Sequence, residues 1–193
     1  GWVSTHDYLV QIKNLDSAET WYWLDTLRGL DRPLHSDTYD AETIDSQIFS
    51  ASAGTGSLGA TLLADDYLVV LHKAGPVAAT AANTEGTLNT AATSVNLLSG
   101  FAMSLYTGSG SNATYGHGLG RPQELVLTLC RDHAGSTRGL YHRQLASAAH
   151  NVDFTATGKQ VSDAGFYNSQ APTDALFSVG TANGTNKAAA QFV

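Results

Sequence analysis

The chain has 193 residues and a formal net charge of −7 at pH 7, and 14% of its residues are charged, against roughly 25% in typical globular domains. Because an acidic chain offers no basic surface to displace counterions from phosphates, we expect no nucleic-acid partner. The single cysteine, Cys130, excludes an intramolecular disulfide. No apolar run approaches the roughly 18 residues of a membrane span, so we expect no membrane partner.

Short apolar strands separated by turn residues dominate the pattern of the chain. No segment keeps a 3.6-residue apolar period over several helical turns, whereas 66–72 (DYLVVLH) is a short apolar run bounded by turn residues, as in the core of a sandwich. Cys130 ends another such run, which predicts a buried, unreactive thiol. The expected strands are 7–13, 20–24, 47–52, 66–72, 101–106, 124–130, 139–145, 152–156, 176–179 and 188–193.

Three segments lack this pattern and are expected to be loops. The glycine-rich 53–59 predicts a flexible turn, and 73–93, rich in Ala, Thr and Asn, predicts a loop or extended linker. The segment 31–45 has no periodicity and predicts a surface loop, with one short strand near Ile44. Its acidic residues are Asp31, Asp37, Asp40, Glu42 and Asp45.

The segment 100–122 (GFAMSLYTGSGSNATYGHGLGRP) predicts two strands joined by a tight glycine turn and followed by a corner. Phe101, Met103 and Leu105 fall on one side of a period-two strand. The glycine- and serine-rich 107–112 suits a hairpin loop. His117 stands between glycines, which permit positive φ, so we expect a corner residue whose ring hydrogen-bonds nearby backbone. We expect this hairpin near the middle of the fold.

An internal repeat divides the chain. Leu9 through Asp16 matches Leu125 through Asp132 at a constant offset, and both copies continue into a further strand. The repeat predicts a first half at 1–76, a linker at 77–99 and a second half at 100–193. The two related halves form either the two sheets of one antiparallel sandwich or two small sandwiches. The chain starts at Gly1 without a recognisable signal peptide, so we expect a processed protein or a segment of a longer one.

The glycine-rich motifs resemble a repeat of phage virion proteins that have a concanavalin-like (LamG-like) β-sandwich. The resemblance covers most of the chain except 75–96. In the second copy it rests on residues 100–110, 116–122, 131–132, 141–145 and 168–180. In the first copy it rests on residues 13–16, 21–29 and 67–72.

The resemblance implies an all-β, antiparallel, concanavalin-like jelly-roll sandwich in a virion protein. We therefore expect a non-enzymatic structural subunit of a phage particle: a capsid decoration, tail or fibre component. The expected partners are copies of itself, as a homo-oligomer, and other virion proteins. The alternative is a carbohydrate- or host-receptor-binding module, with a host surface glycan as partner. The resemblance implies no catalytic residue, and we expect no metal and no cofactor.

Candidate chemistry is weak elsewhere in the chain. Residues 54–59 (GTGSLG) match a dinucleotide-binding glycine pattern, but the flanks are too short for the helix that would face a pyrophosphate, so a glycine turn is favoured. The seven histidines lie at spacings that do not pair two metal ligands on one helix. A glycosidase pair or a Ca²⁺ site is less favoured than a solvated acidic loop. The carboxylates considered are Asp37, Asp40, Glu42, Asp45, Asp65 and Asp66.

Trp21, Tyr22 and Trp23 are the candidate ligand or interface residues. In a strand, Trp21 and Trp23 share one face and Tyr22 takes the other. Tryptophans at such positions fill a core or an interface more often than they bind sugar, and no polar residues cluster beside them. A sugar-stacking platform stays open as the alternative.

Overall fold

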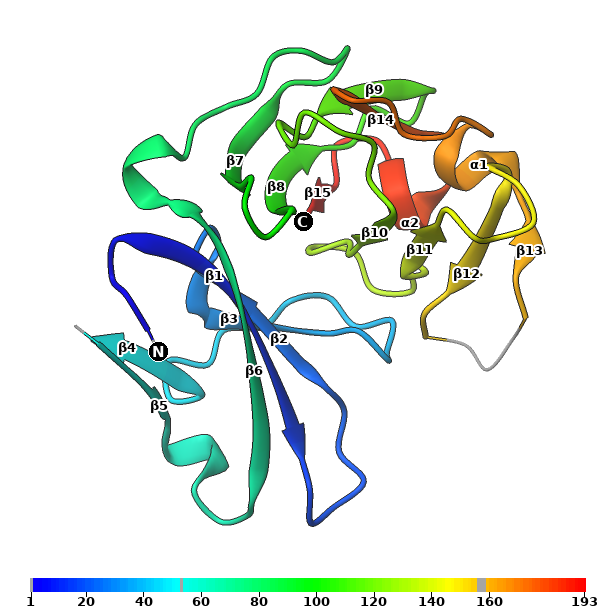
Figure 1. Ribbon diagram of the computed structural model, residues 1–193. Coiled ribbons are helices and arrows are strands. Elements are labelled where there is room, and N and C mark those ends of the chain that lie inside the picture. The colour runs from blue at the N-terminus through cyan, green and yellow to red at the C-terminus, as the bar shows by residue number, and fades with distance from the viewer. Residues whose placement is uncertain (1, 53, 156–158) are drawn as a thin grey trace.

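The computed structural model describes residues 2–52, 54–155 and 159–193, and these form mainly antiparallel β-structure (Figure 1). The predicted all-β class is confirmed, because the two α-helices are single turns and all strand pairings are antiparallel within the described residues. The strands are β1 (His6–Asn14), β2 (Tyr22–Asp25), β3 (Gly29–His35), β4 (Phe49–Ser52), β5 (Thr55–Leu58), β6 (Tyr67–Pro76), β7 (Thr90–Asn96), β8 (Phe101–Thr107), β9 (Ala113–Gly116), β10 (Leu125–Thr128), β11 (Gly139–His142), β12 (His150–Asp153), β13 (Val161–Ser162), β14 (Leu176–Val179) and β15 (Gln191–Phe192). The helices are the single-turn α1 (Ala164–Tyr167) and α2 (Asn183–Asn186) and the 3₁₀ segments η1 (Ala60–Leu62) and η2 (Val77–Ala79).

The first part of the chain forms a four-stranded sheet in the order β3-β2-β1-β6. In β1 the side chains alternate, so that Tyr8, Val10 and Ile12 are buried on one face while Leu9 and Gln11 point to the other. The buried face packs into a cluster that we call the N-terminal core. Its members are Trp2, Tyr8, Val10, Ile12, Leu24, Ile48, Phe49 and Leu62.

The hairpin β4–β5 lies beside this sheet and contributes Phe49 to the N-terminal core. The flexible turn expected at 53–59 is therefore wrong for Thr55–Leu58, which is strand β5; Ala53 lies outside the described residues. The glycine pattern at 54–59 runs through this hairpin into η1, a 3₁₀ segment of three residues. No α-helix follows the pattern, so no helix N-terminus is available to face a pyrophosphate. This agrees with the preference for a glycine turn over a dinucleotide site.

The second part of the chain contains a three-stranded sheet, β15-β8-β7, and a four-stranded sheet, β10-β11-β12-β13. A bridge between Cys130 and Phe192 links the two, and Leu129 and Val193 exchange backbone hydrogen bonds of 2.9 and 3.0 Å. The pair β14–β9 lies beside them. Together these strands enclose the C-terminal core, which consists of Tyr106, Ala113, Tyr115, Val126, Cys130, Tyr141, Phe166, Tyr167, Phe177, Val179, Ala190 and Phe192.

Aromatic stacking organises the C-terminal core. The ring of Tyr106 stacks on Tyr115 with 4.8 Å between centroids and on Phe192 with 5.1 Å, and such pairs stabilise a core beyond the area they bury. Cys130 lies within this core with a fully buried side chain. The prediction of a buried thiol is confirmed.

The hairpin expected within 100–122 is wrong. Strands β8 and β9 form, but β8 pairs with β7 and β15, whereas β9 pairs with β14. The connection between them is held from outside by Asn186 of α2, whose Oδ1 accepts from the Ser109 N–H at 2.7 Å. The partner of each strand is therefore determined by long-range pairing, which a local turn pattern does not reveal.

The expected linker 77–99 contains a strand, which corrects the prediction of a loop through residue 93. Strand β7 pairs with β8, and its buried side chains are polar: the hydroxyls of Thr90 and Thr93 lie 2.8 Å apart, and Thr93 reaches Ser104 of β8 at 3.1 Å. Because the strand is stabilised by hydroxyl pairs and not by apolar alternation, its periodicity did not reveal it.

Strand β14 covers the expected range 176–179, and the other expected strands form with shifted ends. The strand predicted at 152–156 is β12, which runs from His150 to Asp153, and Ala156 lies outside the described residues. No helix in the described ranges combines the length and apolar character needed to span a membrane.

Candidate functional site

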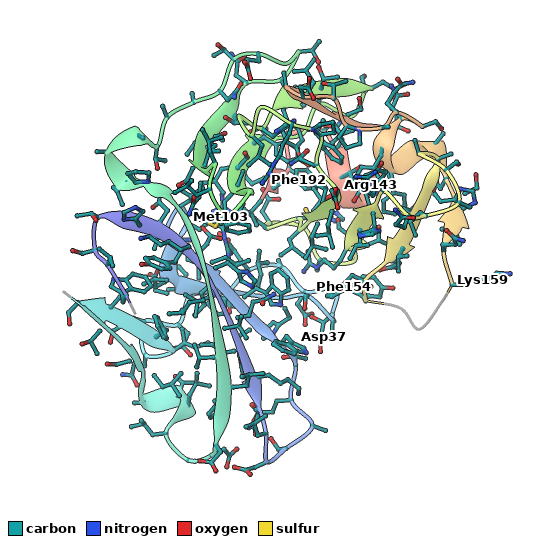
Figure 2. All side chains as sticks on the ribbon, in the orientation of Figure 1. Asp37, Met103, Arg143, Phe154, Lys159 and Phe192 are labelled. Carbon is teal, nitrogen blue, oxygen red and sulfur yellow. The ribbon has the colours of Figure 1, made fainter. Side chains whose placement is uncertain are left out.

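A pocket of about 500 Å³ lies between the N-terminal sheet and the strands of the second part. One wall comes from β1, β2 and β6, and the other comes mainly from β8, β10 and β11. Met103 and Phe154, labelled in Figure 2, lie on the side of the second part that faces the N-terminal sheet. The pocket is thus formed by the two parts of the chain together.

The wall from the N-terminal sheet follows from strand register. The antiparallel pairing places Leu9 opposite both Asp25 and His72, and Gln11 opposite Trp23. Opposite residues in an antiparallel pair share a face. Since Val10, Ile12 and Leu24 take the core face, their neighbours face the pocket.

His72 and Gln11 form a polar pair on this wall. His72 Nε2 lies 2.9 Å from Gln11 Oε1, so the imidazole donates and the amide oxygen accepts. Burial lowers the pKa of His72, because removal from water disfavours the imidazolium. The pair is therefore neutral near neutral pH and adds no charge to the pocket.

Asp25 and Arg28 form an ion pair at the base of the same wall, and both side chains are almost fully buried. Arg28 Nε donates to Asp25 Oδ2 at 2.5 Å, and Arg28 Nη2 donates to the carbonyl of Trp23 at 3.1 Å. A buried charge is tolerated when it is paired and hydrogen-bonded. This ion pair joins the end of β2 to the chain before β3 and leaves neither charge unpaired.

The opposite wall is apolar. Met103 comes from β8, Leu127 from β10 and Leu140 from β11, with Phe154 at the rim after β12. Phe154 meets Trp23 edge-on, with 6.4 Å between ring centroids, and this contact joins the two walls. Phe154 is 40% exposed, so the rim of the pocket presents an apolar surface to solvent.

The three aromatic residues singled out in the sequence do not act together. Trp23 lines the pocket, and Tyr22 packs against the N-terminal core on the other face, as the alternation predicts. Trp21 precedes β2, and its backbone N–H donates to the carboxylate of Asp37 at 3.2 Å. Neither Trp21 nor Trp23 belongs to a core cluster. A ligand role for Trp21, Tyr22 and Trp23 stays a prediction, and Trp23 alone has a pocket beside it.

The acidic loop joins the two parts of the chain through Glu42, which corrects the expected solvated state for this residue, whereas Asp37 and Asp40 are exposed as expected. Glu42 accepts from Arg131 at 3.0 and 2.9 Å and from Arg28 at 3.2 Å, and its side chain is only 13% exposed. Burial by itself raises the pKa of Glu42, but hydrogen bonds and charges from Arg131 and Arg28 outweigh it and hold the pKa below its ordinary value. Glu42 is thus an ionised bridge between the region after β2 and the region after β10.

Arg138 forms the second connection of this loop. Its side chain is fully buried, and its guanidinium donates to three backbone carbonyls: Thr38 at 3.1 Å, Cys130 at 2.6 Å, and Asp40. We call Glu42, Arg28, Arg131 and Arg138 the clamp. Sequence reasoning missed it, because its members are as many as 110 residues apart (from Arg28 to Arg138) and carry no local motif.

The expected corner at His117 is confirmed. The ring is buried, its Nδ1 accepts from the Leu119 N–H at 3.2 Å, and its Nε2 lies 3.2 Å from the carbonyl of Thr173. Burial lowers the pKa of His117 and favours the neutral ring. Both ring nitrogens are therefore used to hold the corner against the turn that precedes β14.

Two other acidic side chains serve as structural hydrogen-bond acceptors. Asp45 accepts from the backbone N–H of Gln47 at 2.8 Å, and Asp65 accepts from the side-chain amide of Asn14 at 2.8 Å. Within the described residues no three histidine, cysteine or acidic side chains gather in a way that could hold a metal ion.

The fold and the pocket define a mainly antiparallel β protein with two separate cores and an apolar pocket between them. A family model with the description "Domain of unknown function (DUF7483)" matches residues 3–193, so the chain belongs to this family. Searches of the curated proteins and of the solved structures found no match.

Proposed function

We propose that the chain is a non-enzymatic structural subunit of a phage particle: a capsid decoration, tail or fibre component located in the virion. The observation that carries this proposal is the buried corner, where His117 and Thr173 meet. These residues belong to two of the segments, 116–122 and 168–180, on which the resemblance to phage virion proteins rests. The use of the histidine to join them supports an architectural role for the motif.

The proposal includes a finer architecture, a concanavalin-like jelly-roll sandwich built from two related halves. Support comes from the two separate cores. It also comes from the repeated strand order, because β1 begins the antiparallel series β1–β2–β3 and β10 begins β10–β11–β12. The matched sequence segments open both series.

The surface suits contact with neighbouring subunits. Charged residues are few, and several large apolar side chains are exposed, among them Leu63 at 71% and Ile44 at 69%. Apolar surface left exposed in the single chain is available for burial between subunits. Copies of the chain and other virion proteins are the partners proposed for it.

The test is the composition of particles. Antibodies raised against the recombinant chain are applied with gold labelling to gradient-purified phage particles, and the same particles are analysed by quantitative mass spectrometry. We expect label at one structural position and a fixed copy number per particle. Serum depleted on the recombinant chain is the control. Absence of the chain from infectious particles would contradict the proposal.

The second candidate is a carbohydrate- or host-receptor-binding module. The observation in its favour is that Trp23 lines a concave wall beside Gln11 and His72, because sugar rings stack on aromatic faces flanked by polar groups. A glycan array tests it with the wild-type chain, Trp23→Ala and the matched control Trp21→Ala, which lies outside the pocket. Binding lost only in Trp23→Ala supports this candidate, and a silent array rejects it.

A further inference from the structure

The pocket between the two parts of the chain has the size of a ligand site. Its volume of about 500 Å³ falls in the range of roughly 300–1,000 Å³ that is usual for pockets that bind small molecules. The subunit role proposed above needs no such cavity, so the pocket calls for an explanation that does not depend on that role.

The polar side chains on its lining are largely bonded to one another. Asp25 is paired with Arg28, and the Gln11 oxygen is paired with His72. The hydroxyl of Ser104 lies 3.1 Å from that of Thr93 on the neighbouring strand. The charges are thus neutralised within the wall, and the Asp25 carboxylate and the Gln11 oxygen already accept hydrogen bonds.

Few hydrogen-bonding groups remain for a ligand. Within the described residues, the side-chain atoms on the lining without a hydrogen-bond partner are Trp23 Nε1, the amide nitrogen of Gln11, the hydroxyl of Tyr115 and Nδ1 of His72, whose Nε2 is the bonded ring nitrogen. A sugar ring or a peptide backbone would bring several donors and acceptors into this space and leave most of them unsatisfied. Each unsatisfied buried group costs about 1–3 kcal/mol.

The rest of the lining is hydrocarbon. Met103, Leu127, Leu129 and Leu140 form its apolar wall, and Leu125 at the rim is 56% exposed. Burying such surface against a hydrocarbon ligand is favourable in proportion to the apolar area removed from water.

We propose that the pocket binds a neutral small molecule that is mainly hydrocarbon and carries at most a single polar group, such as a long-chain alcohol. The pocket accommodates the hydrocarbon body between the N-terminal sheet and the leucines of β10 and β11. The inference goes beyond the proposed particle role and does not rest on it. It competes with the carbohydrate-binding candidate, which places a sugar against Trp23 in the same pocket.

The experiment measures uptake of the neutral dye N-phenyl-1-naphthylamine, followed by its fluorescence, and its displacement by 1-dodecanol. We expect the folded wild-type chain to bind one dye saturably and to release it to 1-dodecanol. Ala102→Trp places an indole on the pocket lining and is expected to weaken dye binding about tenfold or more. Ala91→Trp, at an exposed position on β7, is its matched control and is expected to bind like the wild type.

A second variant keeps the test decisive if Ala102→Trp does not fold. Leu125→Glu changes a half-exposed rim residue and should be tolerated, while the added carboxylate at the mouth lowers dye affinity about tenfold. Leu98→Glu, at a fully exposed position outside the lining, is the control and should have no effect.

Three outcomes overturn the inference. The first is no saturable dye uptake by the folded wild-type chain. The second is equal dye affinity in the pocket variants and their controls. The third is displacement of the dye by a neutral oligosaccharide or a capped peptide at lower concentration than by 1-dodecanol, which would assign the pocket to a polar ligand.

Discussion

At the scale of single residues, Arg138 shows how one buried cation can hold distant backbone in place. Its guanidinium donates to carbonyls at both ends of a span of about 90 residues, from Thr38 and Asp40 to Cys130. Arginine suits this task because its planar fork presents several donors in fixed directions. Removal of the side chain takes this donor away from all three carbonyls.

We expect Arg138→Met to destabilise the chain by about 3 kcal/mol or more, because the substitution leaves buried carbonyls unsatisfied. The measurement is the free energy of unfolding in urea. Arg143→Met is the matched control: Arg143 is 57% exposed and pairs with Glu124, which is 65% exposed. Such a surface pair contributes at most about 1 kcal/mol. Equal losses in the two variants would contradict the role assigned to Arg138.

At the scale of elements, two glycines permit the course of the chain around β8 and β9 for different physical reasons. Gly120 has a φ of +65° in the corner after β9, and an added Cβ there would meet nothing within 4 Å. Gly108 directly follows β8, and an added Cβ would lie 2.2 Å from the carbonyl oxygen of Lys187. Gly120 is required for its backbone conformation, whereas Gly108 is required because there is no room for a Cβ atom.

Gly120→Ala is therefore expected to cost about 1 kcal/mol, the penalty for an L-residue in the left-handed region. Gly108→Ala is expected to cost clearly more, about 2–3 kcal/mol. The backbone at Gly108 and the backbone at Asn186 and Lys187 have to move apart, and this movement disturbs the pairing of β8 with β15. Urea unfolding of both variants gives the comparison. A larger loss in Gly120→Ala would show that the close approach at Gly108 is easily relieved.

The same elements show which parts of the fold were predictable from sequence. Strand β1 was found because burial of one face leaves an alternating local pattern. Strand β6 was found from its continuous apolar run, but the core position expected for it is wrong, because Leu68 is 46% exposed and Leu71 is 38% exposed. Strand β7 was missed because its buried side chains are hydroxyls that bond to one another. The pairing partners of β8 and β9 were missed because register between distant strands leaves no signal in either strand alone.

Only those parts of the candidate site that follow from a local sequence pattern were predictable. Alternation correctly separated Tyr22 from Trp23, and glycine spacing correctly marked the corner at His117. The pocket needs Leu9 and Leu127 to face each other across two parts of the chain, which no spacing encodes. Glu42 looked like one more acid in a surface loop, because its arginine partners come from elements that only the fold brings near.

At the scale of the whole molecule, Glu42 couples the two parts of the chain through charge. Arg28 precedes β3 and Arg131 follows β10, and both donate to the same carboxylate. The loop that carries Glu42 is held further by its own backbone, since the Glu42 N–H donates to the Arg131 carbonyl at 2.6 Å. The coupling therefore depends on pH through the charge of one carboxylate.

The pKa of Glu42 is lower in the folded chain than in the unfolded chain, where it is about 4.3. Its ionised form thus stabilises the fold fully above the unfolded pKa, and this contribution is lost as the pH falls through the lower, folded pKa. At about pH 7 we expect Glu42→Gln to lower the free energy of unfolding by about 2 kcal/mol. At about pH 3 the difference from the wild type should shrink, because the wild-type carboxyl is then increasingly protonated. Urea unfolding at both pH values measures it, with the exposed Glu124→Gln as the control expected to have little effect at either pH. A deficit of Glu42→Gln that stays constant between the two pH values would mean that the charge of Glu42 does not hold the two parts together.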